Sequence, residues 1–298
     1  MSKIQKVIDN NYCIGCGACA IKNTAFTTQR NQYGLITAKY SNANNIDPTM
    51  DEVCPFAASK NENILAEKYF SKIEAIQHEP KLGYYLSLYA GHTTNQTLRE
   101  KTTAGGLTTW LLEKLFKEKL IDGVIHVAPK KNSPDLFEYT VSYNIDEIES
   151  RTKSRYYHVS FSDVKDFLNS ANLSGKYAFV GVPCYIKAMR LLCENDPKLK
   201  EHIAFYFGIF CGHMKTSAFG ELLSWQQGIS PKELKNIDFR VKDYSRPSSQ
   251  YAIKVSDSKT THQESNFKLY GTDWGLGLFK PKACDWCDDI SAELADVV

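Results

Sequence analysis

The chain contains 298 residues, of which 43% are hydrophobic and 23% are charged. This balance is typical of a globular protein with one large or two smaller domains, and it excludes a disordered chain, a collagen-like repeat and a coiled coil. Lys and Arg number 36 against 34 Asp and Glu, so the formal charge of +2 leaves no positive excess for binding nucleic acid or an anionic membrane. The apolar runs are too short to span a bilayer and the first residues lack the apolar core of a secretory signal, so we expect a cytoplasmic protein.

The first part of the chain has few regular elements that the sequence alone identifies. Residues 12–19 form a loop rich in cysteine and glycine, and helical spacing of apolar side chains begins only at residues 63–76. Pro80 and Gly83 indicate a linker. We therefore predict a small domain at residues 1–82 and a larger domain at residues 83–298.

The larger part alternates between apolar runs and amphipathic stretches. Buried strands are predicted at residues 123–128, 177–182 and 203–210, helices at 107–119, 163–168, 185–192 and 217–225, and hairpin strands at 237–241, 251–255 and 267–270. Strands that alternate with helices indicate parallel pairing. The expected fold is α/β, with a small N-terminal domain and a larger α/β domain that has a mixed, partly parallel sheet.

Cysteine is the most informative residue type in the composition. The nine cysteines are Cys13, Cys16, Cys19, Cys54, Cys184, Cys193, Cys211, Cys284 and Cys287. An odd number argues against complete pairing, and thiols in a reducing compartment more often bind metal or carry out redox chemistry than form structural disulfides. Cys193 lies in a predicted helix beside Leu191 and Leu192 and is expected to be a core residue.

Four cysteines of the first part have the spacing of an iron–sulfur site: Cys13, Cys16, Cys19 and the remote Cys54, which Pro55 follows. Three thiolates in one short loop can bind three corners of an iron–sulfur cube. A two-cluster bacterial ferredoxin has a fourth cysteine where this chain has Asn23, so Cys54 is the expected fourth ligand. The segment resembles half of such a ferredoxin, so we expect residues 1–82 to form a ferredoxin-like domain that binds one 4Fe–4S cluster. A zinc site is the alternative, although the cysteine ligands of zinc usually occur as two pairs in the sequence.

A second set of four cysteines comes from three distant segments: Cys184, Cys211, Cys284 and Cys287. Cys184 and Cys211 each follow a predicted strand and precede a helix, and the carboxyl ends of parallel strands share one edge of a sheet. Both thiols should therefore face the same crevice, and the remaining CxxC pair can close over it. From spacing alone a second cluster, a zinc site and simply buried thiols all stay open.

Several segments together carry a family resemblance. They are CIGCGAC at 13–19, CPF at 54–56, EKTTAGGLTTWLLEKLFKEKLID at 100–122, VPCYIKAMR at 182–190, FCG at 210–212 and CDWCDDISAELADV at 284–297. In this order they resemble the β-subunit family of coenzyme factor 420 hydrogenases and dehydrogenases, whose coenzyme is an 8-hydroxy-5-deazaflavin. Plant 7-hydroxymethyl chlorophyll a reductase is similar in its motifs. The chain stops inside the last motif, so we expect its C-terminus to be truncated relative to the family.

The resemblance implies two 4Fe–4S clusters and FAD. It makes the second cysteine set a cluster site, and it implies that FAD lies on Thr102, Thr103, Gly105, Gly106 and Leu107 and near Lys153, Ser154 and Tyr156. The free N–H groups of a helix that begins after Gly106 also suit a pyrophosphate. Where the family usually has Ser before the glycine pair, this chain has Ala104, so the details of cofactor contact differ.

We interpret the chain as an iron–sulfur flavoprotein oxidoreductase. Hydride would be exchanged at the flavin with an unknown small-molecule substrate or a deazaflavin or nicotinamide carrier, and single electrons would pass to a redox partner such as ferredoxin. The alternatives are an electron-transfer subunit of a larger redox complex and a zinc-stabilised binding module without redox activity. No catalytic residue is identified, but His92 and His158 are candidate proton donors, and His213 is a candidate for cofactor contact.

Overall fold

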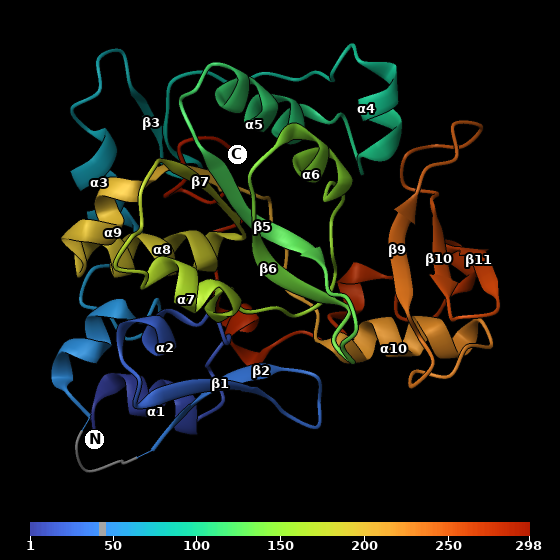
Figure 1. Cartoon of the computed structure of the whole chain (residues 1–298), viewed down its shortest axis with the longest axis horizontal. Helices are drawn as coiled ribbons and strands as arrows, with labels where there is room; N and C mark the ends of the chain where they lie inside the picture. Colours follow the sequence, from blue (N-terminus) through green and yellow to red (C-terminus); the bar gives the residue numbers. More distant parts are fainter. Residues whose placement is uncertain (42–45) are drawn as a thin grey trace.

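The computed structural model describes residues 1–41 and 46–298 (Figure 1). Its helices are α1 (Lys3–Asp9), α2 (Ala18–Lys22), α3 (Glu62–Phe70), α4 (Gln96–Lys101), α5 (Leu107–Lys117), α6 (Ile145–Ser150), α7 (Lys165–Leu168), α8 (Pro183–Glu194), α9 (Pro197–His202) and α10 (Ser217–Gln226). Its strands are β1 (Phe26–Arg30), β2 (Ile36–Tyr40), β3 (Gln77–Glu79), β4 (Gly83–Tyr85), β5 (Gly123–Pro129), β6 (Phe137–Ser142), β7 (Tyr177–Gly181), β8 (Ile203–Gly208), β9 (Asn236–Val241), β10 (Ala252–Ser256) and β11 (Thr261–Ser265).

A four-stranded mixed sheet in the order β6-β5-β7-β8 forms the centre of the molecule. Strands β5, β7 and β8 run parallel, and β6 returns antiparallel to β5. Every residue of β7 is buried, as expected for a central parallel strand that is covered on both faces. Helices α5 and α6 cover one face, and α8 covers the other with α7 and α9 beside it (Figure 1). The predicted α/β class with a partly parallel sheet is confirmed.

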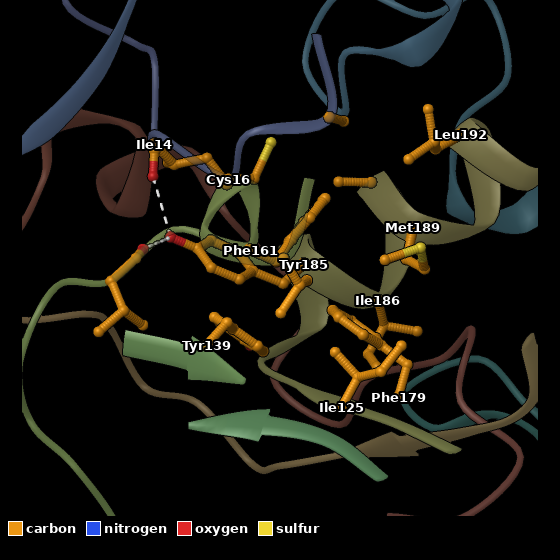
Figure 2. Close-up of a cluster of buried hydrophobic side chains, with 14 of the residues drawn as sticks. Ile14, Cys16, Ile125, Tyr139, Phe161, Phe179, Tyr185, Ile186, Met189 and Leu192 are labelled. Atoms are coloured by element: carbon orange, nitrogen blue, oxygen red, sulfur yellow. Dashed lines mark hydrogen bonds between the residues drawn. The ribbon is translucent and has the colours of Figure 1, made fainter. Parts of the chain in front are cut away.

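The main apolar core lies between this sheet and α8 (Figure 2). Helix α8 begins at Pro183, whose fixed φ suits the first turn of a helix, and every residue from there to Cys193 except Cys184 is buried. Aromatic rings fill the space beneath it, with Tyr139 stacked on Phe179 and Phe161 edge-on to Tyr185. Cys193 is 2% exposed, which confirms its predicted place in the core.

The N-terminal segment shares this core. Its buried side chains, including Ile4, Ile14 and Phe26, belong to the same apolar cluster as the residues under α8. The boundary that the sequence indicates near residue 82 falls in the turn between β3 and β4, and these two strands pair with each other. Residues 1–82 and 83–298 therefore pack together over a continuous interior.

A separate antiparallel sheet of β9, β10 and β11 stands beside α10 (Figure 1). The first two strands lie where the sequence predicts them, but the strand predicted at 267–270 is wrong, because a 3-10 helix occupies Asn266–Lys268. The third strand is Thr261–Ser265 instead. It is an edge strand whose side chains are mostly exposed, so it carries no apolar alternation for sequence analysis to detect. Among the described residues, no helix is long and apolar enough to cross a membrane.

Candidate metal and cofactor sites

The four cysteines of the first set line one cavity. Its walls include Cys13, Cys16, Cys19 and Cys54 together with apolar side chains of α1, and its volume is about 370 Å³ with the mouth included. Backbone N–H groups point at the sulfurs: Gly15 and Ala38 donate to Cys13 Sγ at 3.4 and 3.2 Å. Gly17 and Ala18 donate to the sulfur of Cys16. Such N–H···S bonds are what a bound cluster requires of its surroundings.

Burial makes these thiols costly to ionise in the absence of a cation. It raises the pKa of all four above the usual range, to about 12 for Cys54. The neighbouring sulfurs raise the pKa of Cys19 further by mutual repulsion. A metal that replaces the protons removes both penalties, because metal binding couples to thiol deprotonation. The donor set therefore fits an iron–sulfur cluster.

The first cysteine loop rests on residues 158–162, which sequence analysis did not connect with it. Phe161 N–H donates to the carbonyl of Cys16 at 3.0 Å, and Ser160 Oγ donates to the same oxygen at 3.1 Å. Gly17 has a φ of +100°, and a Cβ there would lie 2.6 Å from Ser160 Oγ and from the backbone nitrogen of Ser162. The close approach of the two segments thus requires glycine at position 17.

His158 joins the same loop to the first residue of β2 through its two ring nitrogens. Nε2 lies 2.8 Å from the carbonyl oxygen of Ile14, and Nδ1 lies 2.8 Å from the backbone nitrogen of Ile36. These partners fix a neutral ring that donates from Nε2 and accepts at Nδ1. Burial lowers the pKa of His158 to about 4. With both nitrogens occupied by backbone, His158 is a structural residue, so the expectation that it donates a proton is wrong. His92, whose Nδ1 lies 2.9 Å from the Thr93 carbonyl oxygen, stays a candidate.

The second set of cysteines lines a second cavity. Cys184, Cys211, Cys284 and Cys287 surround it with Asp289 and His213, and its volume is about 340 Å³ with the mouth included. Cys184 lies in the first turn of α8, directly after β7, and Cys211 follows β8. Burial raises the pKa of all four thiols, to about 12 for Cys211. The structure thus places Cys184 and Cys211 at one edge of the sheet, as their positions after two strands predict.

The C-terminal segment returns to this edge to supply the CxxC pair. Val297 forms a parallel bridge with Phe207 of β8. Arg190 of α8 donates to the carbonyl of Leu294 at 3.0 Å. Cys211 N–H donates to the carbonyl of Ile290 at 3.1 Å. These main-chain contacts hold the last segment beside Cys184 and Cys211.

The two cavities are direct neighbours. Ile14 and Phe56 line both of them. Tyr185, the residue after Cys184, places its hydroxyl 3.2 Å from the carbonyl oxygen of Ile14 and donates to the carbonyl of Val159 at 2.6 Å (Figure 2). Figure 2 shows Ile14 and Cys16 of the first loop directly above Tyr185. Ile14 and Phe56 therefore lie at the boundary between the two sites.

Neither set has the geometry of a single-ion site. Among the residues that the structure describes, no three or more His, Cys, Asp or Glu side chains converge as they would around one metal ion. The ligands of a cube bind different irons and stand farther apart than those of one zinc ion.

The segments expected to contact FAD meet at the N-terminal end of α5. Gly106 precedes α5 with a φ of +80°, and the carbonyl of Gly105 accepts the N–H of Thr93 at 2.9 Å. Thr103 Oγ1 accepts the N–H of Ser154 at 2.8 Å. The structure thereby joins the expected FAD residues of 102–107 to those of 153–156.

Four cations gather at this junction, and sequence analysis identified only Lys153. Lys242 donates to the carbonyls of Arg99 and Ala104. Burial lowers the pKa of Lys242, and the positive charges of Arg99, Lys153 and Arg240 lower it further. Asp238 neutralises part of this charge, because its Oδ2 lies 2.5 Å from Lys153 Nζ. A concentration of positive charge beside a helix N-terminus favours an anion.

Unpaired donors and aromatic rings extend the junction toward the second cavity. The buried Nε atoms of Arg155 and Arg240 have no hydrogen-bond partner among the described residues. Tyr156 lies edge-on to Phe239 and Trp274, with ring centroids 5.6 and 4.9 Å apart. Orphaned donors, cations and rings fit a ligand that combines phosphates with an aromatic system, as FAD does.

Comparison with known proteins identifies relatives over most of the chain. Two family models described as coenzyme F420 hydrogenase/dehydrogenase, beta subunit, match it: the model of the N-terminal part at residues 88–165 and the model of the C-terminal part at residues 174–298. The chain is similar to the coenzyme F420 hydrogenase subunit beta of Methanosarcina barkeri, with 30% identity over 139 residues. That alignment covers 45% of this chain and 46% of the relative, so the chain spans about half the length of the curated relative it matches.

A solved structure has a similar fold. It is a xenon derivative of the F420-reducing NiFe hydrogenase complex from Methanosarcina barkeri, with a TM-score of 0.52 and 19% sequence identity. The match covers 74% of this chain and 72% of the other. At this identity the likeness concerns the fold alone.

Proposed function

The chain belongs to the coenzyme F420 hydrogenase/dehydrogenase β-subunit family, and from this premise we propose that it is an iron–sulfur flavoprotein oxidoreductase. Two 4Fe–4S clusters and FAD are the proposed cofactors. The relatives are subunits of a hydrogenase, which is an oxidoreductase. The observation that carries the proposal is that two sets of four cysteines each line one cavity, with Ile14 and Phe56 shared between them.

The first set would bind one cluster through Cys13, Cys16, Cys19 and Cys54, and the second set the other through Cys184, Cys211, Cys284 and Cys287. When bound, FAD supplies hydride exchange with an organic partner, and the clusters supply single-electron steps. The protein's own residues set the conditions for this chemistry. Apolar side chains surround the first set of sulfurs, backbone N–H groups stabilise the thiolates, and the two sites are close because Ile14 and Phe56 line both cavities.

FAD is proposed to lie on the junction of residues 102–107 with 153–156. The cations Arg99, Arg240 and Lys242 would bind its phosphates, and Tyr156 would contact an aromatic part. The hydride partner is a small organic molecule or a carrier of the deazaflavin or nicotinamide type. The curated relative is named for coenzyme F420, which favours a deazaflavin. A carrier such as ferredoxin would exchange the single electrons.

A second candidate is an electron-transfer subunit of a larger redox complex. The solved relative is part of a multi-subunit hydrogenase complex, which supports this alternative. The two are distinguished by whether the isolated protein turns over a deazaflavin or nicotinamide carrier on its own. The third candidate is the zinc-stabilised module without redox activity, and metal analysis of the purified protein distinguishes it from the other two.

Cysteine variants test the proposal. Protein purified without oxygen should contain about eight irons per chain, as two cubes require, together with releasable FAD. Cys16→Ser and Cys284→Ser should each lower the iron content to about half. Cys193→Ser is the matched control, because Cys193 is buried and lines neither cavity, and it should retain all of the iron. Zinc in place of iron, or equal iron loss in all three variants, would contradict the proposal.

A further inference from the structure

Lys215 is a buried cation without a carboxylate partner. The residue is 2% exposed, and its Nζ donates to the carbonyl of Leu278 at 2.6 Å. The same nitrogen lies 4.7 Å from the ring centroid of Trp274 and 5.1 Å from that of Phe219. No ion pair of Lys215 exists within the part of the chain that the structure describes.

The burial of an unpaired ammonium group costs free energy, which only a further interaction of its charge would recover. A buried ammonium loses its hydration and normally recovers the cost from a paired carboxylate. Here one carbonyl and two ring faces offset only part of it. Burial, with the nearby charge of Lys280, lowers the pKa of Lys215 to about 8, so most molecules still carry the charge at neutral pH. The field of this charge is therefore available to a negative group nearby.

Lys215 contacts Trp274, whose ring links the second cysteine cavity with the proposed FAD site. The Trp274 ring that contacts its Nζ also contacts His213, at 4.6 Å between centroids, and His213 lines the second cavity. Trp274 also contacts Tyr156 of the proposed FAD junction, at 4.9 Å between ring centroids. Met214, which precedes Lys215, also lines the cavity, and its N–H donates to the sulfur of Cys284. The ammonium thus sits one side chain behind the cavity wall.

We propose that Lys215 sets the reduction potential of the second cluster. The residue touches neither cluster nor substrate, and it acts by its electric field across Trp274 and His213. A cluster with four thiolate ligands gains one negative charge when it accepts one electron from the flavin or from dithionite. The fixed positive charge stabilises that reduced state and makes the second cluster easier to reduce relative to the first. This inference rests on the proposed function and assigns a role within it.

Redox titration followed by electron paramagnetic resonance tests the inference on the whole chain with its cofactors bound. The signal of the second cluster is identified by its absence from Cys284→Ser. In Lys215→Met, which keeps the apolar stem but removes the charge, the equilibrium for reducing this cluster should fall about tenfold, or 59 mV for a one-electron couple. Lys215→Arg should keep the wild-type potential, and the first cluster should shift less than the second in each variant.

Two further variants separate the electrostatic effect from structural damage. Lys215→Gln keeps a donor for the Leu278 carbonyl without the charge and should match Lys215→Met. Lys198→Met removes a lysine on α9, whose Nζ donates to the carbonyl of Ser170, and should change neither potential. A second-cluster potential that is the same in Lys215→Met, Lys215→Gln and wild type overturns the inference, as does a shift confined to the flavin. Absence of both clusters from the wild-type protein would instead overturn the proposed function.

Discussion

Replacement of Gly17 by alanine tests whether the first cysteine loop packs directly against residues 160–162. Gly17 has a φ of +100°, and its new Cβ would lie 2.6 Å from Ser160 Oγ and Ser162 N. The left-handed backbone alone costs about 1–2 kcal/mol for a residue with a Cβ. The forced shift of packed backbone adds about 1–3 kcal/mol. The free energy of unfolding should therefore fall by about 2–5 kcal/mol.

Gly228 provides a matched control for this change. Its φ is +81°, but no atom lies within 4 Å of the position that a Cβ would occupy. Gly228→Ala should therefore show only the backbone cost of about 1–2 kcal/mol. Urea unfolding followed by circular dichroism, without oxygen and in parallel with iron analysis, measures both variants. Gly17→Ala should also lose iron, while Gly228→Ala should keep it. Equal stabilities and equal iron contents in the two variants would refute the predicted contact between the loop and residues 160–162.

Three other substitutions address single interactions. His158 has a folded pKa of about 4 against about 6.5 when unfolded, so the neutral ring stabilises the fold above pH 6.5 and this stability is lost as the pH falls toward 4. Between pH 7.5 and pH 5, wild type should lose about 2 kcal/mol more than His158→Gln in urea unfolding, and parallel curves would contradict the assignment. Tyr185→Phe leaves the buried carbonyl of Val159 without its donor and should cost about 1–3 kcal/mol in the same assay; an unchanged midpoint would exclude this role. Lys242→Met should weaken FAD binding about tenfold, measured by flavin fluorescence, and unchanged affinity would place the phosphates elsewhere.

The sequence identified the parts of the site that local spacing determines. The loop of Cys13, Cys16 and Cys19 is a single short segment, so its residues must lie together. Cys184 and Cys211 each follow a continuous apolar run, and parallel strands force the ends of such runs to a common edge. Both features, the short cysteine loop and the shared strand ends, follow from local sequence and do not depend on contacts with distant segments.

The remaining features depend on contacts between distant segments, which no local pattern encodes. The hydrogen bonds from His158 and Ser160 to the first cysteine loop join positions 144 residues apart. Arg240 and Lys242 reach the proposed FAD junction from β9 and the residue after it, and in the sequence they look like ordinary surface cations. The isolation of Lys215 is visible only when the residues around it are known, because burial without a partner is a tertiary property.

The adjacency of the two cysteine cavities is tested most directly by electron paramagnetic resonance of the fully reduced protein. Two paramagnetic clusters in cavities that Ile14 and Phe56 both line should interact, so the wild-type spectrum should be broadened and split. The spectrum of Cys284→Ser, which retains one cluster, should instead be that of a simple isolated centre. A wild-type spectrum equal to the sum of two isolated signals would show that the clusters are not neighbours.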